Sequence, residues 1–123
     1  MNKTSVAVSG PDSEAAHAVA LEDIDVSDPE LYRNYTWQPY FKRLREEDPV
    51  HFCKDSMFGP YWSITKFADI MQVDTSPEIF SSEAKFGGIT IMDDNAAASL
   101  PMFIAMDPPK HDAQRLAVSP IVA

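Results

Sequence analysis

The sequence predicts a mixed α+β fold that is mainly helical and carries one small antiparallel β-sheet. Three observations support this prediction. Apolar residues recur at helical spacing over residues 37–48, two short β-prone segments follow at 50–53 and 61–65, and a second helical pattern covers 67–74. Ten prolines among 123 residues divide the chain into short elements, because proline interrupts both helices and strands.

The first predicted helix lies between Thr36, a possible N-cap, and Pro49. Pro49 is expected to end it, because the residue before a proline is disfavoured in the α conformation. Apolar side chains spaced three and four residues apart form one face of this helix: Trp37, Tyr40, Phe41 and Leu44.

A β-hairpin is predicted next, with strands at Val50–Cys53 and Tyr61–Thr65 and a turn at Phe58–Pro60. Alternation along the first strand places Val50 and Phe52 on one side, and His51 and Cys53 on the other. A His-x-Cys pair without a second pair does not make a zinc site, so no metal is expected there.

A second helix is expected after Thr65, with Ser76-Pro77 ending it, and Phe80–Ser82 is β-prone enough for one more short strand. Residues 83–106 show no clear period, and their second half, residues 100–106, is strongly apolar. Such a segment can line an apolar cavity, but on composition alone packing in the protein core is the more common role.

Asp107-Pro108-Pro109 is typical of a helix start, with Asp107 as the capping acid. His111 and Arg115 are four residues apart in that helix and therefore project from one face. Together they can clamp a carboxylate. An isolated pair of this kind is nevertheless more often part of a solvated helix face.

Composition and charge narrow the classes of function. Nineteen Asp and Glu against ten Lys and Arg give a net charge of −9, which disfavours nucleic-acid binding. Residues 1–24 are expected to be a disordered acidic leader, in which Glu14–Leu21 could form a transient helix, with the ordered part at 25–123. No signal peptide, membrane span, phosphate-binding glycine motif or nucleophile motif is found. We therefore expect a cytoplasmic protein without a complete catalytic set in this chain.

Four blocks in fixed order carry a family resemblance. They are Leu44-Arg45-Glu46-Glu47-Asp48-Pro49-Val50-His51-Phe52, the segment from Tyr61 to Ile70, Phe80-Ser81-Ser82, and Met106-Asp107-Pro108-Pro109-Lys110-His111 with Arg115. In this order and spacing the blocks closely resemble the N-terminal quarter of a bacterial cytochrome P-450, a haem-thiolate monooxygenase. The resemblance runs from about Asp25 to Ala123.

The resemblance implies a function and a set of sites. His111 and Arg115 would donate to the propionates of haem b, and residues 83–106 would cover an apolar substrate. Electrons would come from NAD(P)H through a ferredoxin reductase and a ferredoxin, and one oxygen atom would enter a C–H bond. The residues expected at the substrate pocket are Ile89, Ile91, Met102, Phe103 and Ile104.

Two segments point to one branch of the family. Residues 87–91 and 100–112 resemble the bacterial alkane terminal-hydroxylase class, whose members oxidise the end carbon of medium-chain alkanes and fatty acids. An aliphatic, uncharged segment suits such a substrate, because a hydrocarbon offers only burial and shape.

The iron-ligating cysteine of the family does not match any residue here. Cys53 lies on a predicted strand and lacks the Phe-Gly-x-Gly context, so we do not expect it to bind iron. The chain is therefore expected to be the N-terminal piece of a longer enzyme and inactive alone. The alternative is a free-standing acidic α+β interaction module, and the gene sequence beyond codon 123 distinguishes the two.

Overall fold

The computed structural model of the chain describes residues 11–86, 88 and 102–122. These residues form two compact bodies, the first ending at Asp69 and the second beginning at Ile70. No helix in the described ranges is long and apolar enough to cross a membrane.

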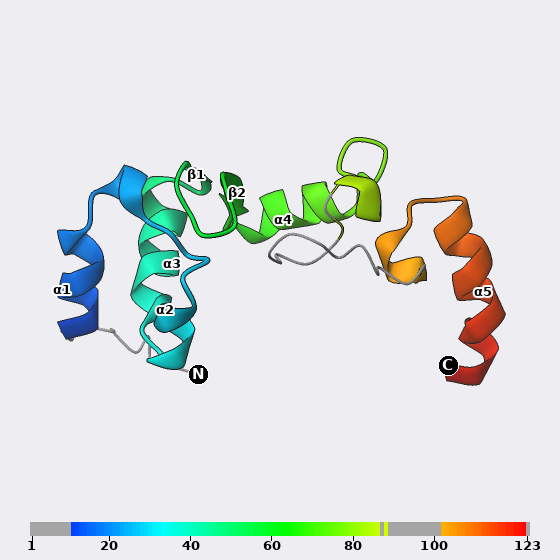
Figure 1. The fold of residues 1–123 in the computed structure, drawn as a ribbon, viewed down its shortest axis with the longest axis horizontal. Coiled ribbons are helices and arrows are strands. Elements are labelled where there is room, and N and C mark those ends of the chain that lie inside the picture. Colours follow the sequence, from blue (N-terminus) through cyan, green and yellow to red (C-terminus); the bar gives the residue numbers. More distant parts are fainter. Residues whose placement is uncertain (1–10, 87, 89–101, 123) are drawn as a thin grey trace, which may run out of the picture. The chain divides into compact units, whose positions relative to one another are not determined.

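The described part of the first body contains three α-helices, a short helical turn at Leu21–Asp23 and a two-stranded sheet (Figure 1). Its elements in chain order are α1 (Pro11–Ala18), α2 (Pro29–Arg33), α3 (Trp37–Glu47), β1 (Val50–Cys53) and β2 (Tyr61–Ile64). Helix α4 (Phe67–Asp74) begins where this body ends. The predicted helices and the predicted strand pair are therefore confirmed within a residue or two at each end.

The core of the first body is small and is built around α3. Ile24, Val26 and Leu44 are at most 6% exposed and form its centre. Leu44 is on the apolar face predicted from the helical spacing, which confirms that face. Half-buried side chains pack against this centre: Val19, Leu21, Tyr40, Phe41 and Tyr61.

Helix α1 corrects the expected disordered leader. The expectation of no fixed structure over residues 1–24 is wrong for residues 11–24, and residues 1–10 lie outside the described ranges. Helix α1 lies beside α3 (Figure 1), and Ala16 is completely buried. Arg43 of α3 donates to the carbonyl oxygens of Ala16 and Val19 at 2.7 and 2.6 Å. The small and polar residues of this segment do not predict that Arg43, far along the chain, caps the end of α1.

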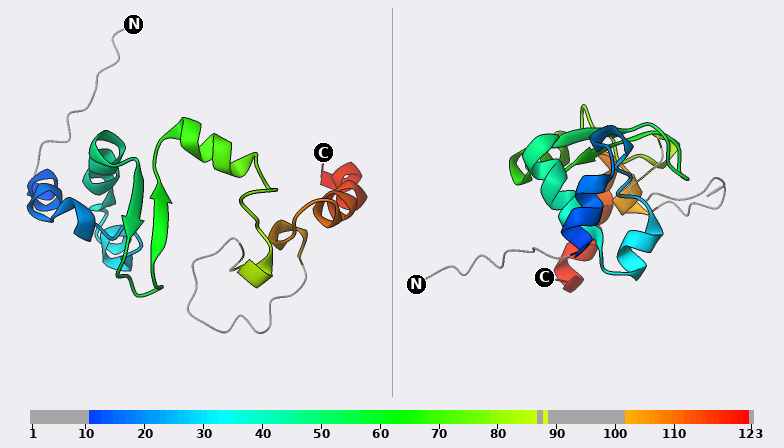
Figure 2. Two further views of the ribbon diagram at one scale, coloured as in Figure 1. Left: turned by 90° about the horizontal axis from the view of Figure 1, so that it is seen from above. Right: turned by 90° about the vertical axis from the view of Figure 1, so that its left-hand side faces the viewer.

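The hairpin pairs Val50 with Ile64 and Cys53 with Tyr61 in an antiparallel register (Figure 2). His51 and Cys53 are on its buried face. Phe52 and Trp62 face each other across the strands on the exposed side, with ring centroids 4.9 Å apart. The two large apolar side chains of β1, Val50 and Phe52, are therefore on the exposed face of the hairpin.

Helix α2 was not predicted, although its sequence carries start and stop signals. Asp28 accepts a hydrogen bond from the Glu30 amide, and Pro29 occupies the first helical position. The helix ends in a Schellman motif, in which the Thr36 amide donates to the Leu31 carbonyl. Tyr35 occupies the left-handed position of this motif with φ of 57°, where glycine is the usual residue.

Three local expectations are corrected. Thr36 precedes α3, but its hydroxyl donates to the Leu31 carbonyl and does not cap the helix. Phe80–Ser82 forms no strand. Asp107 does not cap the last helix, α5 (Lys110–Val122), because its carboxylate is engaged by Ser81 and Ser82. The remaining elements of the second body are helical turns at Ala84–Phe86 and Phe103–Ala105.

Candidate functional site

The candidate site is at the start of α5 in the second body. One carboxylate oxygen of Asp107 accepts from the Ser81 hydroxyl, and the other accepts from the Ser82 amide at 2.9 Å. The Asp107 carbonyl accepts from the His111 amide at 3.1 Å. Asp107 therefore ties a segment 25 residues earlier in the chain to the first turn of α5.

The electrostatics of Asp107 follow from these donors. The pKa of its carboxyl is held below the usual range, mainly by the Ser81 hydrogen bond and then by the Ser82 amide. The positive charges of Lys85 and His111 act in the same direction. The carboxylate is therefore ionised, and remains an acceptor, well into the acidic range.

His111 is oriented by the segment that precedes α5. Its Nδ1 lies 2.8 Å from the carbonyl oxygen of Phe103, and its ring meets the Phe103 ring edge-on at 5.7 Å. A carbonyl only accepts, so Nδ1 is the donor in this contact. Within the described residues, no hydrogen bond engages the other ring nitrogen, Nε2.

Arg115 follows His111 by four residues, just over one helical turn and about 6 Å along the axis. Its side chain is exposed, and among the described residues it makes no ion pair or hydrogen bond. A ring nitrogen and a planar guanidinium on one helix face fit a group that carries carboxylates. The donor set of α5 thus fits the propionates of a haem. The sequence prediction placed both residues on one face of a helix, and they are in α5.

The expected pocket residues are described only in part. Met102 and Ile104 are half exposed, at 55% and 50%, and Phe103 is half-buried against His111. Ile89 and Ile91 lie outside the described residues. Of the three described pocket residues, Phe103 is therefore the one with a contact to a candidate cofactor donor, His111.

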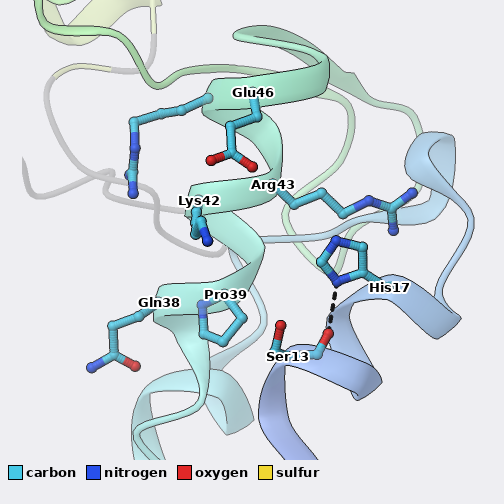
Figure 3. A pocket seen from close by; sticks show the side chains of 8 residues that line it. Ser13, His17, Gln38, Pro39, Lys42, Arg43 and Glu46 are labelled. Atoms are coloured by element: carbon cyan, nitrogen blue, oxygen red, sulfur yellow. Dashed lines mark hydrogen bonds between the residues drawn. The ribbon is translucent and has the colours of Figure 1, made fainter. Parts of the chain in front are cut away.

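The hollows in the described part of the chain include the following two. One, of about 460 Å³, is next to the Asp107 bridge and is lined by Pro77, Glu78, Ser81, Glu83, Phe86, Asp107 and Pro108. The other, of about 130 Å³, is between α1 and α3 (Figure 3), lined by Ser13, His17, Gln38, Pro39, Lys42, Arg43, Arg45 and Glu46. None of the residues expected to bind a cofactor lines either hollow.

His51 and Cys53 serve the core of the first body. The ring nitrogens of His51 lie 2.9 Å from an Asp48 carboxylate oxygen and 2.9 Å from the Ile24 carbonyl. Burial, and then the Asp25 carboxylate, raise the pKa of the Cys53 thiol, which favours the neutral form. Metals bind the thiolate. The described residues contain no group of three or more potential metal ligands.

The known proteins to which the chain is similar belong to one family. The chain is 32% identical over 112 residues to linalool 8-monooxygenase of Pseudomonas putida, covering 84% of this chain and 27% of that protein. It is 44% identical to CYP153D17 from Sphingomonas sp. PAMC 26605, with a TM-score of 0.72, covering 85% of this chain and 26% of that one. No protein-family profile matches the chain.

A second solved structure agrees. Cytochrome P-450-153 from Novosphingobium aromaticivorans is 41% identical, with a TM-score of 0.68, over 80% of this chain and 29% of that one. The described fold is thus similar to that of a family whose named members include a monooxygenase. The chain is similar in sequence and fold to the N-terminal part of cytochromes P-450, which confirms the resemblance found in the sequence. It spans about a quarter of the length of the relatives that it matches.

The sequence did not predict that Ser81 and Ser82 take part in the site, or that Asp107 binds them. An acid before two prolines was interpreted as a helix cap, yet its partners come from Ser81 and Ser82. The Phe80–Ser82 segment contains two serines that can donate hydrogen bonds to an acid, but the sequence does not show which acid accepts them. Only the fold brings the two segments together.

Proposed function

We propose that this chain is the N-terminal part of a haem-dependent monooxygenase that inserts one oxygen atom into an unactivated C–H bond. The observation that carries the proposal is the pair of carboxylate donors on α5, His111 and Arg115, in a chain similar to named cytochrome P-450 monooxygenases. The activity belongs to the whole protein, of which this chain corresponds to about a quarter.

His111 and Arg115 hold the two propionates of haem b in this proposal. The haem, when bound, supplies the oxygen-activating iron, while this chain supplies two positive donors and part of the pocket wall. Charge-assisted hydrogen bonds of this kind are the strong class. The iron ligand is a cysteine other than Cys53, since Cys53 is buried in the first body. A ferredoxin and its reductase bring electrons from NAD(P)H.

The substrate class is a medium-chain alkane or fatty acid, hydroxylated at its end carbon. Met102, Phe103 and Ile104 support this choice, because they are uncharged and apolar, Met102 and Ile104 are half exposed, and Phe103 contacts His111. Such a wall recognises a hydrocarbon by burial and shape, at about 25 cal/mol per Å² of apolar surface. Two relatives carry names with largely hydrocarbon substrates, linalool 8-monooxygenase and vitamin D(3) 25-hydroxylase.

The test uses the full-length haem protein with NADH, a ferredoxin reductase and a ferredoxin. Octane, dodecanoic acid and linalool are supplied separately, and products are identified by gas chromatography with mass spectrometry. We expect 1-octanol and the terminally hydroxylated acid. Oxidation of linalool alone would contradict the alkane class but support the monooxygenase. A protein that binds haem and oxidises none of the three would contradict both.

A further inference from the structure

We infer that His111 links the cofactor to the substrate-lining segment by donating from both ring nitrogens at once, Nδ1–H to the Phe103 carbonyl and Nε2–H to a propionate. The inference deepens the proposed function and rests on it. The first contact is present in the structure at 2.8 Å, and the second is the role proposed for His111 above.

The number of N–H groups on the imidazole ring of His111 decides whether both contacts can form at once. A neutral imidazole has one N–H and one lone pair, whereas an imidazolium has two N–H groups. Because the Phe103 carbonyl can only accept, the single proton of a neutral His111 is held on Nδ1. Nε2 would then present a lone pair to a carboxylate, which is repulsive. Both contacts are therefore made together only by the doubly protonated ring.

The charges around His111 are mixed. Asp107 lies in the turn before α5 and interacts with the His111 charge, and Asp112 is the next residue on the helix. Arg115, one turn later, and Lys110 oppose a second positive charge. The Phe103 ring meets the imidazole edge-on and carries no charge. Two propionates would add acceptors for N–H donors at this face.

The Phe103 carbonyl transmits the effect to the pocket segment. It accepts from the Met106 amide at 3.2 Å as well as from His111, and the Ala105 amide donates to Met102 at 3.0 Å. These bonds define the helical turn that carries Met102 and Ile104. One imidazole therefore contacts both the cofactor and this turn, and each contact uses its own ring nitrogen.

Two amide variants separate the two ring nitrogens. The side-chain nitrogen of asparagine reaches about as far as Nδ1, and that of glutamine about as far as Nε2. His111→Asn is therefore expected to keep the Phe103 contact and lose the propionate. His111→Gln is expected to keep the propionate and lose Phe103. Gln114→Ala, an exposed change on the same helix, is the matched control.

The experiment measures two quantities on each full-length haem protein. One is the rate of haem transfer to excess apomyoglobin, and the other is hydrogen exchange at the Ala105 and Met106 amides. We expect His111→Asn to transfer haem roughly tenfold faster, as expected for one lost charge-assisted hydrogen bond. We expect His111→Gln to transfer haem nearly as slowly as wild type but to exchange both amides roughly tenfold faster.

A third measurement covers variants that do not fold. Nitrogen NMR of His111 in the wild-type ferrous carbon-monoxide form, which is diamagnetic, should show both ring nitrogens protonated. A single N–H there, or variants whose haem transfer and amide exchange change together, would overturn the link while leaving the proposed function intact. A wild-type protein that binds no haem would instead overturn the proposed function.

Discussion

Asp107 shows how one side chain can determine the geometry of a site from outside it. Its carboxylate binds the Ser81 hydroxyl and the Ser82 amide, and its carbonyl binds the His111 amide. Hydrogen bonds to an ionised acceptor are about twice as strong as neutral ones. The position of His111 therefore depends on a group that touches no cofactor.

Asp107 gives a pH prediction with a definite sign. Its folded-state pKa is lowered, so the bridge is intact above the ordinary carboxyl range and is lost as pH falls through the lowered value. Ser81→Ala removes the largest cause of the lowering and should raise this midpoint towards the ordinary value of 3.8. Carbon NMR of the Asp107 carboxyl in the full-length protein measures it.

Ser119→Ala is the control for the Asp107 titration. The Ser119 hydroxyl donates to the Arg115 carbonyl on the same helix and does not contact Asp107. Its midpoint should match that of wild type. An unchanged midpoint in Ser81→Ala would contradict the bridge.

At the scale of elements, α1 is held on α3 by one buried arginine. Arg43 donates to two carbonyls at the end of α1 and pairs with Glu47 on its own helix. Its side chain is only 10% exposed, so these bonds are shielded from water. The last carbonyls of a helix lack partners within the helix, and Arg43 supplies them.

Arg43→Ala is therefore expected to destabilise the first body by about 2 kcal/mol, the loss of charge-assisted bonds with two carbonyls left unpaired. Arg45→Ala, an exposed neighbour on α3, should change stability by less than about 0.5 kcal/mol. Urea unfolding of the full-length variants measures both. Equal effects of the two substitutions would show that Arg43 does not hold α1.

The elements that were predicted are those whose signal is local. Helices α3 and α4 and the hairpin follow from spacing and turn residues within about ten positions. Helix α1 was expected at most as a transient helix over Glu14–Leu21, because its stability depends on Arg43, and the carbonyls that Arg43 binds are 24 and 27 residues away along the chain. The Asp107 bridge was missed for the same reason, since Ser81 is 26 residues from it. Local patterns do not show such contacts.

For the whole molecule, the order of short blocks was more informative than any single motif. His111 and Arg115 alone resemble an ordinary solvated helix face, and only the resemblance to a cytochrome P-450 makes them candidate cofactor donors. The comparisons confirm that family over 85% of the chain. The structure adds an observation that neither the sequence nor the comparisons provide. His111 is hydrogen-bonded to Phe103, in the segment expected to line the pocket.

The central claim is that α5 holds the cofactor through His111 and Arg115. The most direct measurement is the rate of haem transfer to excess apomyoglobin from the full-length double variant His111→Ala, Arg115→Ala, with Gln114→Ala as control. The account predicts at least about tenfold faster transfer from the double variant, because two charge-assisted hydrogen bonds are lost, and an unchanged rate for the control. A double variant that retains haem as long as the wild type would contradict the account.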